Sequence, residues 1–519
     1  MTTTGSDTTL TLPADENQAL GIGQFAVDFA GAAIGDPAPA VGDRTLMFFT
    51  DSMICGLSAI ALGTNAPKIL RAEAAEYDQP DGVPLFGSTR RVAPEKAVAA
   101  NCAAVRELDA NGTNFGYNPA LGHTAGEFGH NDYYPVAIAA AQLTSGTGAD
   151  ALRGMLLIDE IRGRLAEVFS LKSYKIDHVV HGAIASAATF GAMIGATPRQ
   201  IESAIGMVVA HYIPWRAIRA GEQLSDSKGA SAALAAEMAV LSVKRAMRGF
   251  VGPGDIFRNP AAIFRFFEPT AGPAPFDLVL THSGEDFAVM GMHFKLGLYE
   301  HQSAGALAGL IGLLTKHRHL LDDPEQIQAI KIIAYEPAFS IIGDPAKRDP
   351  RTRQSADHSM VYIIARTLAK AFNLARGGPA NVPGGIDDAW QQLMLGPDDY
   401  RREALRDTQT RRLMARITFA HGGKKYDDRY PDGIPTSVVI TTTAGDTLDS
   451  GLIMYPAGHA RNKTANLPRL LKAKWLTLAA PAVDEPQRIT DRLNALPGLD
   501  AAGLASLYDF SIKDRGTFH

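Results

Sequence analysis

Long runs of small apolar residues at helical spacing dominate the first half of the chain, and no other feature constrains its fold as strongly. From about Gln18 to Arg248 the sequence is rich in Ala, Leu, Ile and Met, with Gly and Pro at short intervals. Two runs, HGAIASAATFGAMIGA and KGASAALAAEMAVLSV, carry side chains small enough for helix backbones to approach closely. Thr197 followed by Pro198 indicates a helix with a threonine cap and a proline in its first turn. This half therefore predicts an all-helical domain with a buried central bundle.

The second half of the chain has a different composition. Gly, Pro and Phe become frequent around residues 250–276, which indicates a domain boundary shortly afterwards. Residues 326–335 and 437–443 cluster β-branched side chains as strands do. Helices are expected near Ser303 to Thr315, His358 to Ala371 and Pro397 to Arg406. The mixture predicts a smaller α+β domain, and helical spacing returns after YPAGHAR, so the C-terminus is expected to rejoin the helical domain.

Charge and cysteine content exclude several classes of protein. The chain has 519 residues, with 50 Lys and Arg against 55 Asp and Glu, so its charge balance predicts neither nucleic acid nor an anionic membrane as a partner. Only Cys55 and Cys102 are present, too few for a cysteine-ligated iron–sulfur cluster. Neither GxGxxG after a strand nor GxxxxGK[ST] occurs, so nucleotide cofactors lack sequence support. We therefore expect no cofactor.

The N-terminal segment MTTTGSDTTLTLPADEN has neither a basic start with an apolar stretch nor an Arg-rich amphipathic pattern. It predicts a short disordered lead-in. The longest apolar stretches, such as Ala304 to Leu314, fall short of the roughly 20 residues that span a bilayer. These features predict a soluble, cytoplasmic protein.

Polar residues that precede apolar helices are the candidates for chemistry. Asp109, Thr113 and His130 lie in loop or helix-start sequence before an apolar run, and loops on a rigid scaffold commonly carry functional sites. Lys228 stands at the start of an almost entirely apolar helix, where it either extends into solvent or is relieved by an anionic ligand. Lys295 precedes another such helix.

His178 and His181 are spaced i, i+3 and could share a helix face. No Glu pairs with them as in an HExxH zinc site, so we expect no metal site there.

Several segments, in their order along most of the chain, resemble the MmgE/PrpD family. They are LDANGT, GHNDYYPVAIAAAQ, SDSKGASAA, RGFVGP, FKLGLYEHQSA, ADHSMVYIIA and YPAGHARN. The resemblance implies a mainly α fold, in which a large all-helical domain is completed by the C-terminus and carries a smaller α+β lid domain. The site would lie between the two, and homodimers would be usual. Together with the composition shifts this predicts a lead-in over residues 1–17, a helical domain over 18–289, a lid over 290–455 and a C-terminal segment over 456–519.

By position, the resemblance carries over site residues. His130, Lys228, Lys295, Asp109 and His178 would be catalytic, and Thr113, Lys228, Lys295 and His301 would contact substrate. The segment NPALGHTAGEF makes the loop between Thr113 and His130 longer than the family pattern, and Gly112 stands where an acidic residue is common.

The activity implied is dehydration of 2-methylcitrate, or a close tricarboxylate, to 2-methyl-cis-aconitate. The two lysines would hold carboxylates and offset developing negative charge while His130 removes the proton, with His178 or a lysine as proton donor. Decarboxylation of cis-aconitate and epimerisation of an iminodisuccinate-type acid are alternatives, because the bond aligned for cleavage decides the outcome. An inactive dimeric binding protein and a metal-dependent hydratase are the remaining ones.

Overall fold

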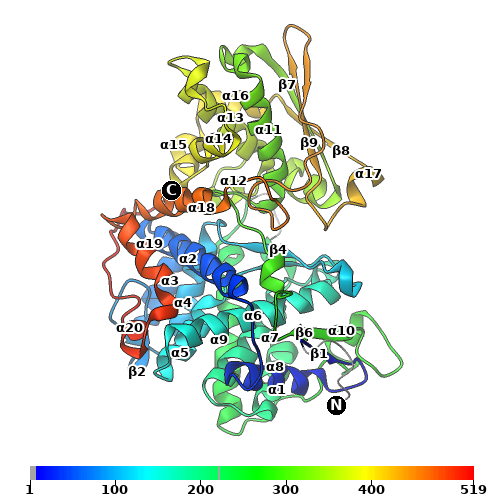
Figure 1. Ribbon diagram of the computed structural model, residues 1–519, viewed down its shortest axis with the longest axis vertical. Helices are drawn as coiled ribbons and strands as arrows, with labels where there is room; N and C mark the ends of the chain where they lie inside the picture. The colour runs from blue at the N-terminus through cyan, green and yellow to red at the C-terminus, as the bar shows by residue number, and fades with distance from the viewer. Residues whose placement is uncertain (1–7, 220–222, 519) are drawn as a thin grey trace.

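The computed structural model describes residues 8–219 and 223–518, and it is mainly α-helical (Figure 1). A helical body occupies the lower part of Figure 1 and an α+β part the upper. This confirms the predicted fold class. The body contains α1 (Gln18–Ala30), α2 (Pro39–Ala61), α3 (Asn65–Ala74), α4 (Pro94–Glu107), α5 (Tyr134–Leu143), α6 (Gly148–Val168), α7 (Val179–Met193), α8 (Pro198–His211), α9 (Asp226–Met247) and the short α10 (Ile263–Phe267).

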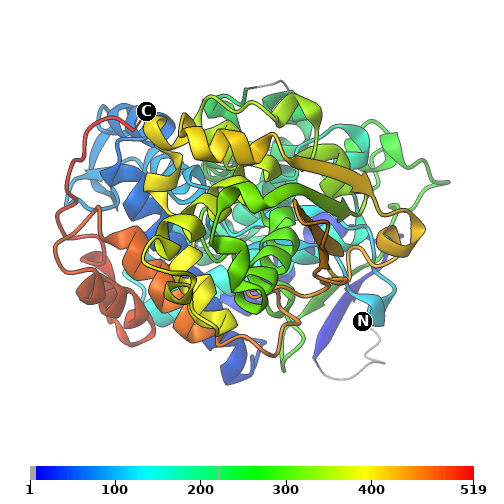
Figure 2. The same ribbon diagram turned by 90° about the horizontal axis from the view of Figure 1, so that it is seen from above.

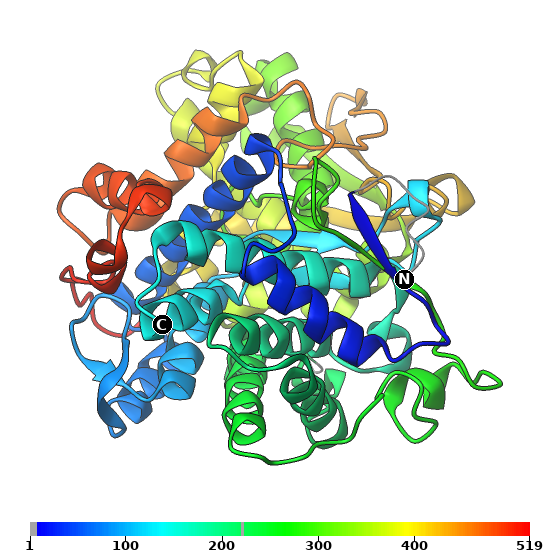
Figure 3. The same cartoon turned by 60° about the horizontal axis from the view of Figure 1, so that its bottom comes forward.

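Small residues let α7 form the centre of the body. α7 packs against α1, α5, α6, α8 and α9, and most of its buried residues are Ala, Gly, Val or Ile. A Cβ on Gly182 would lie 2.0 Å from the Tyr133 ring, so only glycine admits this approach. α1, blue in Figure 3, lies against α7 and α8.

The cap predicted at Thr197 is present, since its side chain accepts a hydrogen bond from the Gln200 amide and α8 begins at Pro198. Among the described helices, no single one is long and apolar enough to cross a membrane. α2 and α3 meet that criterion only as a pair bent by 89°.

Short two-stranded ribbons interrupt the body, which therefore is not all-helical. Their strands are β1 (Thr9–Leu12) with β6 (Leu278–Thr281), β2 (Asp78–Pro84) with β3 (Arg91–Val92), and β4 (Thr113–Phe115) with β5 (Phe128–His130), all antiparallel. The prediction of a disordered lead-in is wrong for residues 8–17, whereas residues 1–7 lie outside the described part. The alternation in TLTL has the period of a strand, and it buries Leu12 while β6 supplies the hydrogen-bonding edge.

The α+β part is built around one four-stranded sheet. Its strand order is β10-β9-β7-β8, with β7 parallel to β8 and antiparallel to β9. The elements are β7 (Ile327–Ala334), β8 (Ile417–His421), β9 (Thr436–Thr442), β10 (Thr447–Asp449), α11 (Ala304–Lys316), α12 (Arg353–Ala356), α13 (Met360–Ala375), α14 (Ile386–Leu393), α15 (Arg402–Leu405), α16 (Thr408–Met414) and α17 (Lys424–Asp427). β7, β9, α11 and α13 confirm the predicted elements. The helix expected near 397–406 is instead two short turns, residues 397–400 and α15.

The chain passes from the body to the α+β part and back at neighbouring positions. The Phe294 amide donates to the Gly458 carbonyl at 2.8 Å, so the outgoing and returning segments are hydrogen-bonded to each other. The returning chain forms α18 (Leu467–Ala479), α19 (Pro486–Asn494) and α20 (Ala501–Ala505). α18 and α19 pack on α2, and in Figure 2 this red segment lies beside the blue helices. The domain boundaries at 289 and 455 stay predictions.

A buried ion pair joins α18 to α2. The Lys474 ammonium lies 2.7 Å from the Asp51 carboxylate, and the Trp475 indole donates to the same carboxylate at 2.9 Å. Burial raises the pKa of Asp51, and Lys474 opposes that rise. The returning chain thus completes the core of the body.

Candidate active site

A cavity lies where the body meets the α+β part. Asp109, Thr113, His130, His178 and Lys228, all predicted from the sequence, line it. They come from the ends of α4 and α9, the β4–β5 ribbon and the residue before α7. The structure therefore brings these five side chains together.

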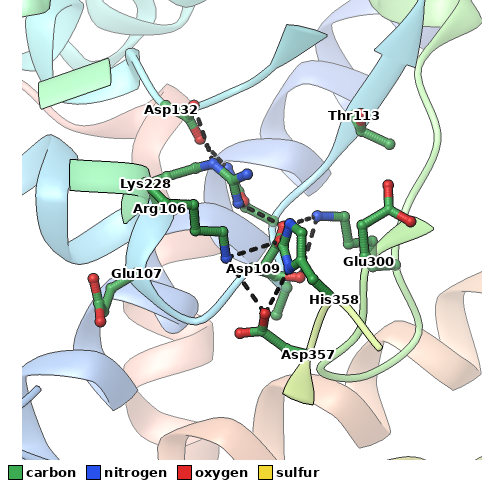
Figure 4. Close-up of polar contacts among 12 residues, drawn as sticks. Arg106, Glu107, Asp109, Thr113, Asp132, Lys228, Glu300, Asp357 and His358 are labelled. Atoms are coloured by element: carbon green, nitrogen blue, oxygen red, sulfur yellow. Dashed lines mark hydrogen bonds and ion pairs between the residues drawn. The ribbon is translucent and has the colours of Figure 1, made fainter. Parts of the chain in front are cut away.

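Asp109 is the centre of this arrangement (Figure 4). Its Oδ1 lies 2.5 Å from Arg106 Nη1 and also accepts from Lys295 Nζ. Its Oδ2 lies 3.2 Å from Lys228 Nζ and 3.0 Å from His358 Nε2. Asp109 has a φ of +50°, a conformation that short polar residues such as Asp tolerate better than most, and it turns the carboxylate back toward the end of α4.

The charges around Asp109 determine its protonation. Burial alone would raise its pKa, but Arg106, Lys228 and Lys295 hold the pKa well below 3.8. Asp109 therefore remains ionised and cannot act as a proton donor at neutral pH. The pKa of Lys295 is lowered, chiefly by burial.

Lys295 differs from the sequence prediction in its surroundings. It is fully buried, donates to both the carbonyl and the carboxylate of Asp109, and is not among the described residues that line the cavity. Lys228 does line the cavity, with 1% of its surface exposed. Lys295 thus acts on the cavity through Asp109, while Lys228 faces it directly.

The β4–β5 ribbon explains how the long loop serves the site. Thr113 and His130 are 17 positions apart but lie directly opposite each other across the ribbon. The Thr113 hydroxyl donates to the Gly129 carbonyl at 2.9 Å. His130 Nδ1 is buried without a hydrogen-bond partner anywhere in residues 8–219 and 223–518. Burial, then Arg106 and Lys295, lower the pKa of His130 well below 6.5, so its imidazole is neutral.

His178 forms a second neutral imidazole beside His130, with ring centroids 5.1 Å apart. Burial lowers its pKa well below 6.5. Arg219 Nη2 donates to His178 Nε2 at 3.2 Å, and Arg219 is itself held by Asp177 at 2.5 Å. Because a guanidinium only donates, His178 Nε2 is the acceptor and the proton of the neutral ring is on Nδ1.

The α+β part contributes cavity residues that the sequence analysis missed. Glu300 and His358 line the cavity, and Asp357 lies 3.4 Å from Lys228 and 2.6 Å from His358. Burial raises the pKa of Glu300 to about 7, and the negative charge of Asp109 adds to that rise. The DHS segment at 357–359, quoted above for the resemblance, was a signal that could have pointed to two of them.

His301 lies elsewhere. It is buried, stacks on His293 with centroids 5.2 Å apart and contacts Phe115, but it is not among the described residues that line the cavity. Phe115 does line it. The position therefore does not support direct contact of His301 with substrate. Glu300, the preceding residue, faces the cavity instead because the short turn that begins at His301 directs the two side chains differently.

Asp109, Asp357 and His358 offer ligand atoms within 4.8 Å of one another, a spacing that a metal ion can use. Lys228 is shared by both carboxylates, so a cation bound there would face this ammonium group. The donor set therefore fits a metal poorly, and the expectation of no metal site stays a prediction.

Among the described residues, five cationic side chains line the cavity, namely Arg106, Arg216, Arg219, Lys228 and Lys347. Asp109 and Glu300 are the acidic ones. An excess of cations next to three neutral imidazoles, those of His130, His178 and His358, defines an anion-binding site with proton-transfer groups. Several cations in one cavity suit a ligand that carries several carboxylates.

Comparison with known proteins agrees with this class of site. The model of the MmgE/PrpD N-terminal domain matches residues 23–275, and that of the MmgE/PrpD C-terminal domain matches residues 389–496. Together the two matches span more than half of the chain, which therefore belongs to the MmgE/PrpD family.

Three relatives align along most of their length. A probable 2-methylcitrate dehydratase of Saccharomyces cerevisiae is 23% identical over 473 residues, covering 86% of this chain and 83% of the relative. The 2-methylcitrate dehydratase of Escherichia coli O157:H7 is 23% identical over 442 residues, covering 83% of this chain and 84% of the relative. An alkylcitrate dehydratase, phiI, of a fungal species is 25% identical over 481 residues, covering 88% of each chain.

Proposed function

We propose that this protein is a cofactor-independent hydro-lyase that dehydrates 2-methylcitrate to 2-methyl-cis-aconitate. The observation that carries the proposal is the convergence of Lys228, Arg106 and two neutral histidines on one cavity. The names of the relatives support this substrate and this reaction. The polycarboxylate substrate would enter between the body and the α+β part.

Proton abstraction is assigned to His130. A neutral imidazole can accept the proton on the carbon next to a carboxylate, and the buried Nδ1 of His130 has no partner among the described residues. Arg106 and Lys295 disfavour a charged His130 in the ligand-free protein. A bound anion offsets that positive charge and raises the His130 pKa, so substrate itself strengthens the base.

Stabilisation of the developing carbanion is assigned to Lys228. The negative charge that builds on the adjacent carboxylate needs a fixed cation in a water-poor cavity, and Lys228 is held there by Asp109 and Asp357. Asp109 positions Lys228, and Lys295 positions Asp109.

The hydroxyl on the neighbouring carbon then leaves as water, for which it must gain a proton. Glu300, with a pKa of about 7, is partly protonated at neutral pH and can supply this proton, while the Nδ1–H of the neutral His178 ring can donate a hydrogen bond to the departing hydroxyl. The C–H proton goes to His130, the C–O bond breaks and the double bond forms between the two carbons. A lysine donor is less favoured, because Lys228 already serves the carboxylates.

The test is incubation of the purified protein with 2-methylcitrate, citrate, cis-aconitate and iminodisuccinate, followed by product analysis. We expect water loss from 2-methylcitrate. Carbon dioxide from cis-aconitate would establish the decarboxylase instead, inversion of iminodisuccinate the epimerase, and binding without turnover the inactive binding protein. Unchanged activity with excess chelator is expected and would exclude the metal-dependent hydratase.

The role of His130 has its own test. In D2O the wild-type protein should exchange the abstracted proton of 2-methylcitrate, whereas His130→Asn should lose exchange and turnover together. His178→Gln should retain exchange while it slows water loss. Exchange at the wild-type rate in His130→Asn would reassign the base.

A homodimer and a cytoplasmic location are also proposed. Phe250 and Val251, after α9, expose 54% and 84% of their surface, as side chains at a subunit interface do in an isolated chain. Light scattering should give twice the 55.3 kDa chain mass, and cell fractionation tests the location.

A further inference from the structure

Two cations at the cavity differ from the others because neither forms an ion pair with a carboxylate of the described residues. Arg106, Lys228 and Arg219 each contact a carboxylate. Arg216 and Lys347 line the same cavity, are half-buried, and make no side-chain ion pair or hydrogen bond within the described residues. An unneutralised cation that is partly removed from water is unfavourable unless a ligand supplies the opposite charge.

The two side chains come from opposite sides of the cavity. Arg216 begins the short turn Arg216–Arg219 in the body, before α9. Lys347 ends the turn Pro345–Lys347 in the α+β part. An anion between them would therefore contact both parts of the molecule at once.

Their backbones are fixed to the catalytic segments. The Arg216 amide donates to the Lys175 carbonyl at 2.8 Å, and the adjacent Trp215 pairs with Ile176, two residues before His178. The Lys347 carbonyl accepts from the Ser359 hydroxyl at 2.7 Å, next to His358. The backbones of both cations are thus fixed beside the histidines, although neither side chain forms an ion pair or hydrogen bond within residues 8–219 and 223–518.

Burial at the cavity disfavours the charged form of both side chains. Burial lowers the pKa of Lys347, and the charges of Lys228 and Arg216 lower it further, while Glu300 and Asp344 oppose this. Burial also lowers the pKa of Arg216, with Arg219 adding to it and Asp177 and Glu127 opposing it. In each case burial is the largest cause, and a carboxylate bound between the two side chains would offset it.

We propose that Arg216 and Lys347 form a distal carboxylate subsite, which binds a carboxylate of the substrate that the inner cations do not hold and so selects tricarboxylates over dicarboxylates. The inference rests on the proposed function for the identity of the substrate. It adds to that function the two residues that distinguish tricarboxylates from dicarboxylates. It also adds a ligand contact that the body and the α+β part share. Ile341 and Ile342, which line the cavity shortly before Lys347, would face the apolar portion of the same ligand.

The test measures binding rather than turnover. Tricarballylate has three carboxylates and no hydroxyl to lose, and glutarate has only the two outer ones. Isothermal titration of the full chain should show tighter binding of tricarballylate. In Arg216→Gln/Lys347→Gln, tricarballylate affinity should fall by about 10- to 100-fold, the range for loss of a charge-assisted hydrogen bond, while glutarate affinity changes by less than about threefold.

A matched control removes the same charge elsewhere. Arg248→Gln/Lys331→Gln changes two exposed cations of the same types at the end of α9 and on β7, and should leave both affinities unchanged. Thermal unfolding midpoints establish that both double variants are folded, and glutarate binding reports an intact inner site.

Each of three outcomes would overturn the subsite: equal wild-type affinity for the two acids, equal loss of both in the Arg216/Lys347 variant, or no loss in that variant. Turnover of 2-methylcitrate is measured separately. Dehydration without a change of acid preference in the variant rejects the subsite and leaves the proposed function standing. A change of acid preference without dehydration supports the subsite and rejects the proposed function. If both hold, KM for 2-methylcitrate should rise in the variant more than kcat falls.

Discussion

Replacing Asp109 with Asn tests whether this carboxylate holds the cations of the cavity in place. Asn has nearly the same shape and tolerates the positive φ of this position, so the change removes charge without adding backbone strain. The fully buried Arg106 and Lys295 would lose their shared carboxylate. Removing one partner of a buried ion pair costs about 3–5 kcal/mol.

The expected shift in melting temperature follows from the length of the chain. An unfolding entropy of about 2.1 cal/mol/K per residue, applied to 519 residues unfolding as one unit, makes the loss equal to roughly 3–5 °C. Turnover should fall to background, because Lys228 and His358 both contact this carboxylate.

The assay is thermal unfolding followed by circular dichroism at pH 7 and pH 3. The native pKa of Asp109 lies well below 3.8, so its stabilising contribution is complete above pH 3.8 and is lost as the pH falls further. The difference between wild type and Asp109→Asn should therefore shrink by about 1.4 kcal/mol per pH unit below that point.

The matched control is Asp398→Asn. Asp398 pairs with Arg401 at 2.6 Å, but its side chain is 88% exposed, and such surface pairs contribute less than about 1 kcal/mol. A shift for Asp109→Asn no larger than that of the control, or one that does not diminish at pH 3, would refute the reasoning.

Three further predictions concern other positions. Lys228→Met should lower kcat by about a thousandfold or more, because it removes the cation that faces the carbanion, while Asp109 and Asp357 keep other cationic partners; a near-normal rate would remove Lys228 from the mechanism. Glu300→Gln should raise stability at pH 8 by about 3 kcal/mol and not at pH 4, since a native pKa raised from 4.5 to about 7 costs about 1.4 kcal/mol of stability per pH unit as the pH rises through that interval; urea unfolding at the two pH values measures this. Gly182→Ala should cost about 1–3 kcal/mol by overpacking against Tyr133, whereas Gly312→Ala, where a Cβ meets nothing within 4 Å, should be neutral or stabilising; unfolding midpoints that order the two the other way would contradict the packing argument.

The sequence alone predicted those elements that are determined by interactions between residues close together in the chain. The cap at Thr197 and the β-branched runs of β7 and β9 are set by neighbouring residues, and all three lie where the sequence predicts. The strand at residues 9–12 was missed because four alternating residues are a weak signal beside a polar composition. The β6 edge that stabilises this strand lies more than 260 residues away in the chain, as the pairing of Leu10 with Leu280 shows.

The site residues also fall into two groups, those that local sequence can predict and those whose position depends on packing. Asp109, His130 and Lys228 stand at loops and helix starts of the body, which a pattern along the chain can identify. Glu300 and Lys347 acquire their positions only when the α+β part packs onto the body, and no local pattern records that contact. Lys295 carries the expected type of side chain at the expected place, but its burial beneath Asp109 depends on packing and could not be deduced.

The ion pair between Lys474 and Asp51 has a consequence for synthesis on the ribosome. The two residues are 423 positions apart, and translation at about 5–20 residues per second separates them by roughly 20 to 85 seconds. During that interval α2 is complete, yet the carboxylate at its centre has no ammonium partner. The nascent body must therefore leave Asp51 accessible to water or protonated, and a chaperone that shields this face of α2 would be most useful during that delay.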